Sequence, residues 1–227
     1  MSVQQTGTTS QSTAVSPVSE RLIGAAASAW EAKLDSRFIR EATDGTLSED
    51  VLARYMLLEA EFVTVAARAL GSAILRAPGL PAIRGHAATM ASFIGDQHDF
   101  FDQVSAAGGA AEPGPNARRR AEQLGERVLE ICDTGTYAEI VACMYPSERL
   151  YALWCSRAAA VPAQRSEALQ EWITSHAELP YIDTVDFLTH EVDSLVVSDD
   201  EIEHLGALVS EILHLEMEFL EACYDLD

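Results

Sequence analysis

Apolar residues recur at helical spacing along almost the whole chain. Over residues 18–34 one stripe at i, i+3 and i+4 spacing is apolar, and it contains Leu22, Ala25, Ala26, Ala29, Trp30 and Leu34. Stretches in which apolar and polar residues alternate, as they do in strands, extend over only a few residues. The hydrophobic pattern therefore predicts an all-α protein.

Clusters of Gly, Pro and small polar residues divide this periodic sequence into separate helices. Turns are predicted at residues 44–47, 78–79 and 108–116. The remaining segments predict helices at about 18–34, 48–77, 81–107, 116–133, 137–160, 163–178, 181–196 and 199–225. Seven or eight helices with short loops favour a bundle. Residues 1–16 are rich in Ser, Thr and Gln, and they predict a disordered tail before a single domain at 17–227.

Charge and cysteine usage narrow the function classes. The chain has 36 acidic against 15 basic residues and a formal charge of −21, so its surface should repel phosphate backbones and anionic lipids. We therefore expect no nucleic-acid partner. No apolar run approaches the ~20 residues of a membrane span, and the N-terminus does not have the pattern of a signal peptide, so a cytoplasmic protein is expected. The four cysteines have no CxxC spacing and predict reduced thiols in the core.

Several short segments, taken in order, resemble the TenA/thiaminase II family. They are Trp30, 37–39, 44–47, 55–59, 135–140, 144–147, 150–151, 172–173, 216–219 and 222–224. The resemblance covers residues 20–225 or so and implies the haem-oxygenase-like helical fold. It further implies hydrolysis of a C–N bond on an aminopyrimidine, of the kind used in thiamin salvage, with no cofactor. A small heterocyclic substrate and a homo-oligomer, specifically a homotetramer, are implied as well.

The same resemblance assigns roles to individual residues. Glu216 matches the Glu that shuttles a proton, and Tyr151 matches a pocket tyrosine. Phe62 and Phe219 match the aromatic walls. Glu59 occupies the position of the Asp that binds ring nitrogens, with the same charge and one more methylene. The alternative interpretations are structural: Glu216 is a surface carboxylate, and Glu59 or Glu61 is a buried glutamate paired with an arginine such as Arg68.

The chain departs from the family at three pocket positions. Ser147 stands where the usual branch has a nucleophilic Cys, and a serine hydroxyl is barely ionised near neutral pH without an adjacent base. Glu148 follows directly, but on a helix it points about 100° away. We therefore expect Ser147 to orient the substrate or a water. His176 and Leu124 stand where pocket tyrosines are expected. A second branch of the family lacks the Cys and relies on carboxylates, and the chain resembles that branch more closely.

Two other classes of protein remain open from the sequence. Glu61, His98, Asp186 and His190 are candidate ligands of a non-haem iron oxidase, because helix bundles build such sites from carboxylates and imidazoles. His98 is not preceded by the Glu-x-x-His pairing that these sites favour, so no metal is predicted. A pocket protein that binds a pyrimidine without turnover is the second alternative. A transcriptional regulator, a label also attached to this family, is disfavoured by the negative charge.

Overall fold

The computed structural model describes residues 16–106 and 112–226, with side chains described outside 95–111. Within these residues every regular element is an α-helix, and no strand occurs, which confirms the predicted fold class. The ten helices are α1 (Val18–Ala25), α2 (Ala27–Leu34), α3 (Arg37–Asp44), α4 (Glu49–Arg76), α5 (Leu80–Ala106), α6 (Pro115–Thr134), α7 (Tyr137–Ala159), α8 (Glu167–Ala177), α9 (Tyr181–Asp193) and α10 (Asp199–Ala222). The prediction of seven or eight helices was therefore too low.

The two additional helices lie near the N-terminus. The predicted helix at 18–34 is interrupted at Ala26, whose backbone angles (φ −103°, ψ 18°) leave the helical range, so α1 and α2 are separate. A further short helix, α3, occupies the segment before the predicted turn. It ends at Gly45, whose φ is 74°, and a Cβ added there would lie 2.4 Å from the carbonyl oxygen of Gln164. Only glycine fits this turn without strain.

Side-chain caps fix where the long helices begin. Ser48 accepts a hydrogen bond from the backbone of Val51 at the start of α4. Both α7 and α10 begin with capping boxes, in which the cap hydroxyl and a glutamate three residues later each satisfy a backbone N–H group. Ser166 caps α8, which therefore starts four residues later than the sequence pattern predicted.

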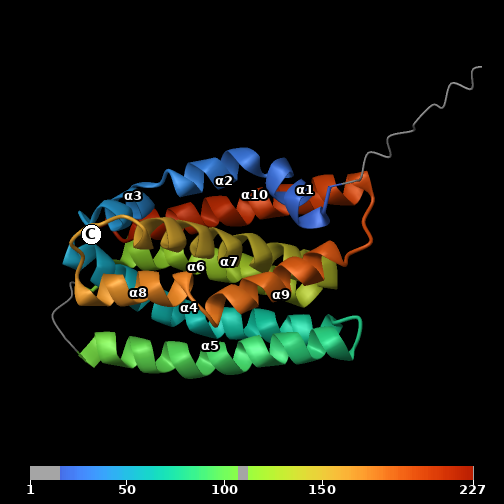
Figure 1. Cartoon of the computed structure of the whole chain (residues 1–227), viewed down its shortest axis with the longest axis horizontal. Helices are drawn as coiled ribbons and strands as arrows, with labels where there is room; N and C mark the ends of the chain where they lie inside the picture. The colour runs from blue at the N-terminus through green and yellow to red at the C-terminus, as the bar shows by residue number, and fades with distance from the viewer. Residues whose placement is uncertain (1–15, 107–111, 227) are drawn as a thin grey trace, which may run out of the picture.

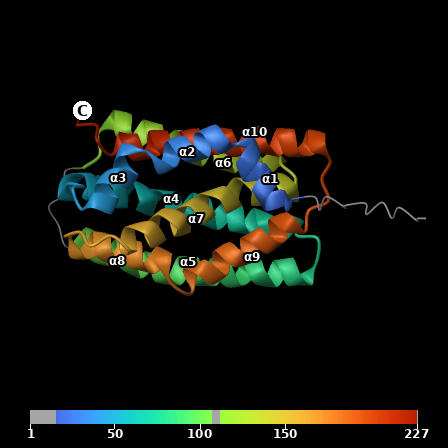
Figure 2. The same cartoon turned by 45° about the horizontal axis from the view of Figure 1, so that its top comes forward.

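Helix α7 is the central element of the bundle, packing against α3, α4, α8, α9 and α10. Helices α1 and α2 run along α10, while α5 lies at one edge on α4 (Figures 1 and 2). Large buried side chains fill the interior, among them Tyr55, Tyr145 and Trp154. All four cysteines are buried and free of disulfides, as predicted. Among the described residues, no helix is long and apolar enough to cross a membrane.

Candidate functional site

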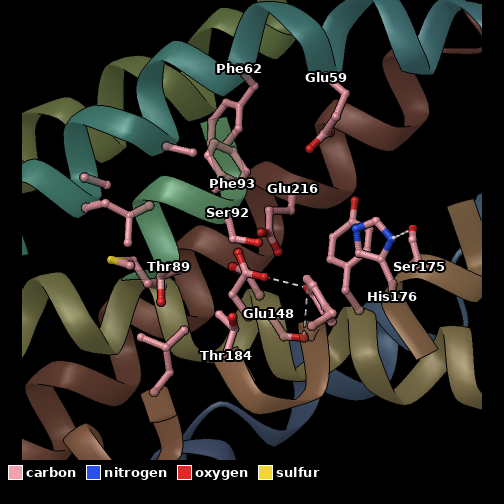
Figure 3. A pocket seen from close by; sticks show the side chains of 18 of the residues that line it. Glu59, Phe62, Thr89, Ser92, Phe93, Glu148, Ser175, His176, Thr184 and Glu216 are labelled. Atoms are coloured by element: carbon pink, nitrogen blue, oxygen red, sulfur yellow. Dashed lines mark hydrogen bonds between the residues drawn. The ribbon is translucent and has the colours of Figure 1, made fainter. Parts of the chain in front are cut away.

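A cavity of about 420 Å³ lies inside the bundle. It is lined by residues of α2 and of all seven helices from α4 to α10. The side chains drawn in Figure 3 converge on this space from several helices. All seven residues singled out from the sequence line it: Glu59, Phe62, Ser147, Tyr151, His176, Glu216 and Phe219. Leu124 and Cys143 line it too. The fold therefore brings together residues that are widely separated in sequence.

Aromatic rings form the walls of the cavity. Phe62 and Phe219 meet edge to face with ring centroids 6.2 Å apart. Behind them the buried ring of Tyr55 packs against Phe219 at 6.2 Å and against Trp172 at 5.6 Å. These contacts hold the rings at fixed angles, as edge-to-face pairs do in protein interiors. The walls suit a flat, apolar-faced ligand.

Three glutamates, Glu59, Glu148 and Glu216, line this largely apolar cavity, and Lys33 provides a positive charge beside them. Lys33, from α2, forms an ion pair with Glu216 from α10, and its side chain is only 1% exposed. The same ammonium lies 5.2 Å from the ring centroid of Tyr151. Glu216 is thus a cavity residue and not an exposed surface carboxylate. The pairing of Glu59 with Arg68 is also wrong, because Arg68 is exposed and the cation near this cluster is Lys33.

Glu59 has the most perturbed carboxyl in the cluster. Burial, together with the charges of Glu216 and Glu148, raises its pKa to about 8, while Lys33 and a hydrogen bond with Tyr55 act in the opposite direction. The Glu59 carboxyl is therefore protonated at neutral pH. In that state it can donate one hydrogen bond and accept another, whereas a carboxylate can only accept.

Glu148 also faces the cavity, although on the helix it lies about 100° from Ser147. Tyr181 donates a 2.5 Å hydrogen bond to Oε2 of Glu148. Burial raises the pKa of the Glu148 carboxyl, and this hydrogen bond opposes the increase. The cavity covers a broad face of α7, since Cys143, Met144, Ser147, Glu148 and Tyr151 all line it. A face that wide accommodates two neighbouring residues about 100° apart.

Hydrogen bonds and burial determine the protonation states of the polar side chains on α7 and α8. Nδ1 of His176 lies 2.8 Å from the carbonyl oxygen of Trp172, which can only accept, so this nitrogen carries the proton. Burial lowers the pKa of His176 to about 4, and the neutral ring keeps a lone pair on Nε2, on the side that faces the cavity (Figure 3). The hydroxyls of Tyr55 and Tyr151 share a 2.9 Å hydrogen bond. Burial raises the pKa of the Cys143 thiol, so this cysteine is not a ready thiolate.

The residues considered for an iron site do not converge. Glu61 is exposed and pairs with Arg118, and both Asp186 and His190 are exposed on α9. The side chain of His98 lies outside the described residues. Within the described part of the chain, no group of three or more His, Cys, Asp or Glu side chains is placed to hold a metal ion.

Sequence reasoning missed Lys33 and Tyr181, and it set Glu148 aside. A signal for Lys33 was available, because it follows Ala29 and Trp30 at i+4 and i+3 and so lies on the apolar face of its helix. A lysine on such a face needs a buried counter-charge. The signal for Glu148 was its alignment with Met144 and Tyr151 on one helical stripe.

These features define an all-α protein built around a cavity that combines acidic groups with aromatic walls. The sequence profile of the TENA/THI-4/PQQC family matches residues 25–226, and the chain belongs to that family. None of the curated proteins compared with the chain matches it.

Solved structures share the fold at low sequence identity. A TenA homologue from Pyrococcus furiosus superposes with a TM-score of 0.81 at 19% identity, covering 91% of this chain and 100% of that one. A protein from Sulfolobus solfataricus that is named as a TenA-like thiaminase gives a TM-score of 0.71 at 14% identity, with 92% and 96% covered. A domain from Shewanella denitrificans with a heme oxygenase-like fold gives 0.68 at 14% identity, with 93% of each chain covered.

Proposed function

We propose that this protein hydrolyses a C–N bond on an aminopyrimidine or a related amino-heterocycle, in a thiamin-related role and without a cofactor. The observation that carries the proposal is the placement of the Glu59 carboxyl among aromatic walls, in the same cavity as the Lys33–Glu216 ion pair. Membership of the TENA/THI-4/PQQC family and the likeness to a TenA-like thiaminase agree with it.

Ring recognition follows from the state of Glu59. An aminopyrimidine presents a ring nitrogen, which accepts, beside an amino group, which donates. A protonated carboxyl complements this edge with two hydrogen bonds, donating through its O–H and accepting through its carbonyl. Phe62 and Phe219 would hold the faces of the ring. The lone pair on Nε2 of His176 offers a further acceptor for an amino group.

Bond cleavage is assigned to the opposite part of the cluster. The Lys33–Glu216 pair supplies a proton through Glu216 to the leaving nitrogen as the C–N bond breaks, and ammonia departs. Ser147 and Tyr151 orient the reacting groups by hydrogen bonding. In this role Ser147 needs no base, unlike a serine that attacks.

The decisive comparison is between Glu216→Gln and Ser147→Ala, with ammonia release from an aminomethyl-pyrimidine as the assay. Loss of a general acid costs about 10²–10⁴-fold in rate, so Glu216→Gln should lose nearly all turnover while ligand binding weakens little. Ser147→Ala should cost less. Glu218→Gln is the matched control, because Glu218 is 57% exposed on the same helix and pairs with Arg120.

Two other outcomes have clear meanings. If Ser147→Ala is the more damaging change, Ser147 attacks the substrate covalently. If the wild-type protein binds an aminopyrimidine but releases no ammonia, it is a non-catalytic pyrimidine-binding protein, and the proposed hydrolysis is wrong.

A further inference from the structure

One carboxylate of the cluster, Glu148, has no role in the reaction as proposed so far. We propose that Glu148 is the general base that activates the hydrolytic water, with Tyr181 as the residue that positions it. This inference rests on the proposed hydrolysis and assigns the group that activates water, which is the nucleophile in place of the missing cysteine.

The placement of Glu148 is the first argument. In Figure 3 the carboxyl of Glu148 lies near that of Glu216 in the cavity, and the two interact electrostatically. Tyr181 from α9 donates a hydrogen bond to Glu148. The hydrogen bond from Tyr181 engages Oε2 of Glu148 and does not involve Oε1. Because Glu148 lines the cavity, Oε1 is available to accept a hydrogen bond from water.

The cost of burial is the second argument. Taking a carboxylate out of water is expensive unless it is paired or hydrogen-bonded. Glu216 has Lys33 as its direct partner, whereas Glu148 has the hydroxyl of Tyr181 and only the more distant charge of Lys33. A tie between α7 and α9 could be made equally well by a glutamine at position 148. A glutamate at position 148 can also accept a proton, which a glutamine cannot.

The groups that face Glu148 set its state. They are Tyr181 from α9, Glu216 from α10, Lys33 from α2 and Glu59 from α4. Tyr181 and Lys33 favour the ionised form of Glu148, while burial and Glu216 oppose it. In the proposed reaction Glu59 binds the ring, Glu148 accepts a proton from water, and Glu216 delivers a proton to the leaving nitrogen. Environments that separate the states of neighbouring carboxyls are how one site carries out both acid and base chemistry.

The step balances without any further reactant. Oε1 of Glu148 takes a proton from water as the water oxygen bonds to the carbon that carries the leaving nitrogen. The C–N bond breaks with its electron pair going to nitrogen, and the Lys33–Glu216 pair protonates that nitrogen. The proton then held by Glu148 returns to the pair. One water is consumed, one ammonia is released, and a hydroxyl replaces the amino group.

The test combines Glu148→Gln, Glu148→Ala and Tyr181→Phe in the ammonia-release assay. Glu148→Gln should lower kcat about 10²–10⁴-fold and leave the KM for the aminomethyl-pyrimidine within about threefold. Sodium formate should restore part of the activity of Glu148→Ala, because a small carboxylate can replace the missing base. Tyr181→Phe should shift the acidic limb of the kcat profile to higher pH. A purely structural tie predicts neither the formate rescue nor the pH shift.

The failures of the two proposals are distinguishable. If wild type is active, Glu216→Gln is inactive and Glu148→Gln keeps more than a third of the activity, the role of Glu148 is wrong and the proposed hydrolysis stands. If Glu148→Ala is inactive but formate restores nothing, and Tyr181→Phe leaves the pH profile unchanged, the base role is overturned as well. If wild type releases no ammonia from any aminopyrimidine, both proposals fail together.

Discussion

The protonated state of Glu59 makes the stability of the protein depend on pH in a direction that is unusual for a carboxyl. In the unfolded chain this group has its ordinary pKa near 4.5, and in the folded protein the pKa is about 8. Between these values the folded state binds more protons than the unfolded state, so stability falls as pH rises. The stabilising contribution is complete below pH 4.5 and is lost through pH 8.

The magnitude follows from the pKa difference. One pKa unit corresponds to about 1.4 kcal/mol, so the two units from pH 6 to pH 8 give roughly 3 kcal/mol as an upper limit. Glu59 opens onto the cavity, where water moderates the cost of ionising it. We therefore expect wild type to lose about 1–3 kcal/mol of unfolding free energy over this range, and Glu59→Gln to lose correspondingly less.

Urea unfolding at intervals between pH 6 and pH 9 measures this difference. His86 and His176 have lowered pKa values, so their contribution changes below the ordinary histidine pKa of 6.5 and is common to both proteins. The raised pKa of Glu148 likewise cancels in the comparison. Glu61→Gln, which alters an exposed carboxylate on the same helix, should follow the wild-type curve. Curves for wild type and Glu59→Gln that stay parallel within about 0.5 kcal/mol would refute a protonated Glu59.

Four further outcomes are expected. Lys33→Met should lower the unfolding free energy by about 3–5 kcal/mol, because it leaves a buried carboxylate without its partner, and adding Glu216→Gln should recover part of the loss in a double-mutant cycle. Gly45→Ala should be destabilised in thermal unfolding by about 1–2 kcal/mol or more, since φ there is positive, whereas Gly24→Ala, with nothing within 4 Å of an added Cβ, should be neutral or slightly stabilised. Elemental analysis of protein grown with added iron should find no stoichiometric iron, manganese or zinc, and one or two bound irons per chain would favour the oxidase. Light scattering should give the mass of a homotetramer, and a monomer would contradict the prediction drawn from the family resemblance.

Much of the fold was predictable because its determinants are local. Periodicity and turn residues located α4, α6 and α7 to within about two residues. The interruption at Ala26 was not predictable, because that residue lies on an unbroken apolar stripe with no Pro or Gly at the break itself. Its position depends on how α1 and α2 each pack along α10, which is tertiary information.

The residues of the site, like the helices, include some that could be predicted from the sequence and some that could not. Glu59 and Glu216 could be selected from sequence, because a resemblance transfers residue types position by position. Lys33 could not be linked to Glu216, since the pair is separated by 183 residues and no local pattern encodes the contact. Glu148 was excluded by treating a helix face as narrow, whereas the cavity spans two adjacent rows of α7. The number of residue rows of a helix that face a cavity depends on how the neighbouring helices pack, and the sequence of that helix alone does not encode it.

The Lys33–Glu216 pair also bears on how the chain reaches its native state. The two partners are 183 residues apart along the chain, so the binding chamber cannot be completed before the chain has been synthesised through Glu216. Contacts of such long range make loop closure costly and slow, and they form late unless other interactions bring the segments together. Any ligand that the finished chamber binds acts on all the helices around it, and at a concentration 100 times its Kd would add about 2.7 kcal/mol to global stability. Occupancy of the chamber would thus control the lifetime of the whole molecule against unfolding and proteolysis.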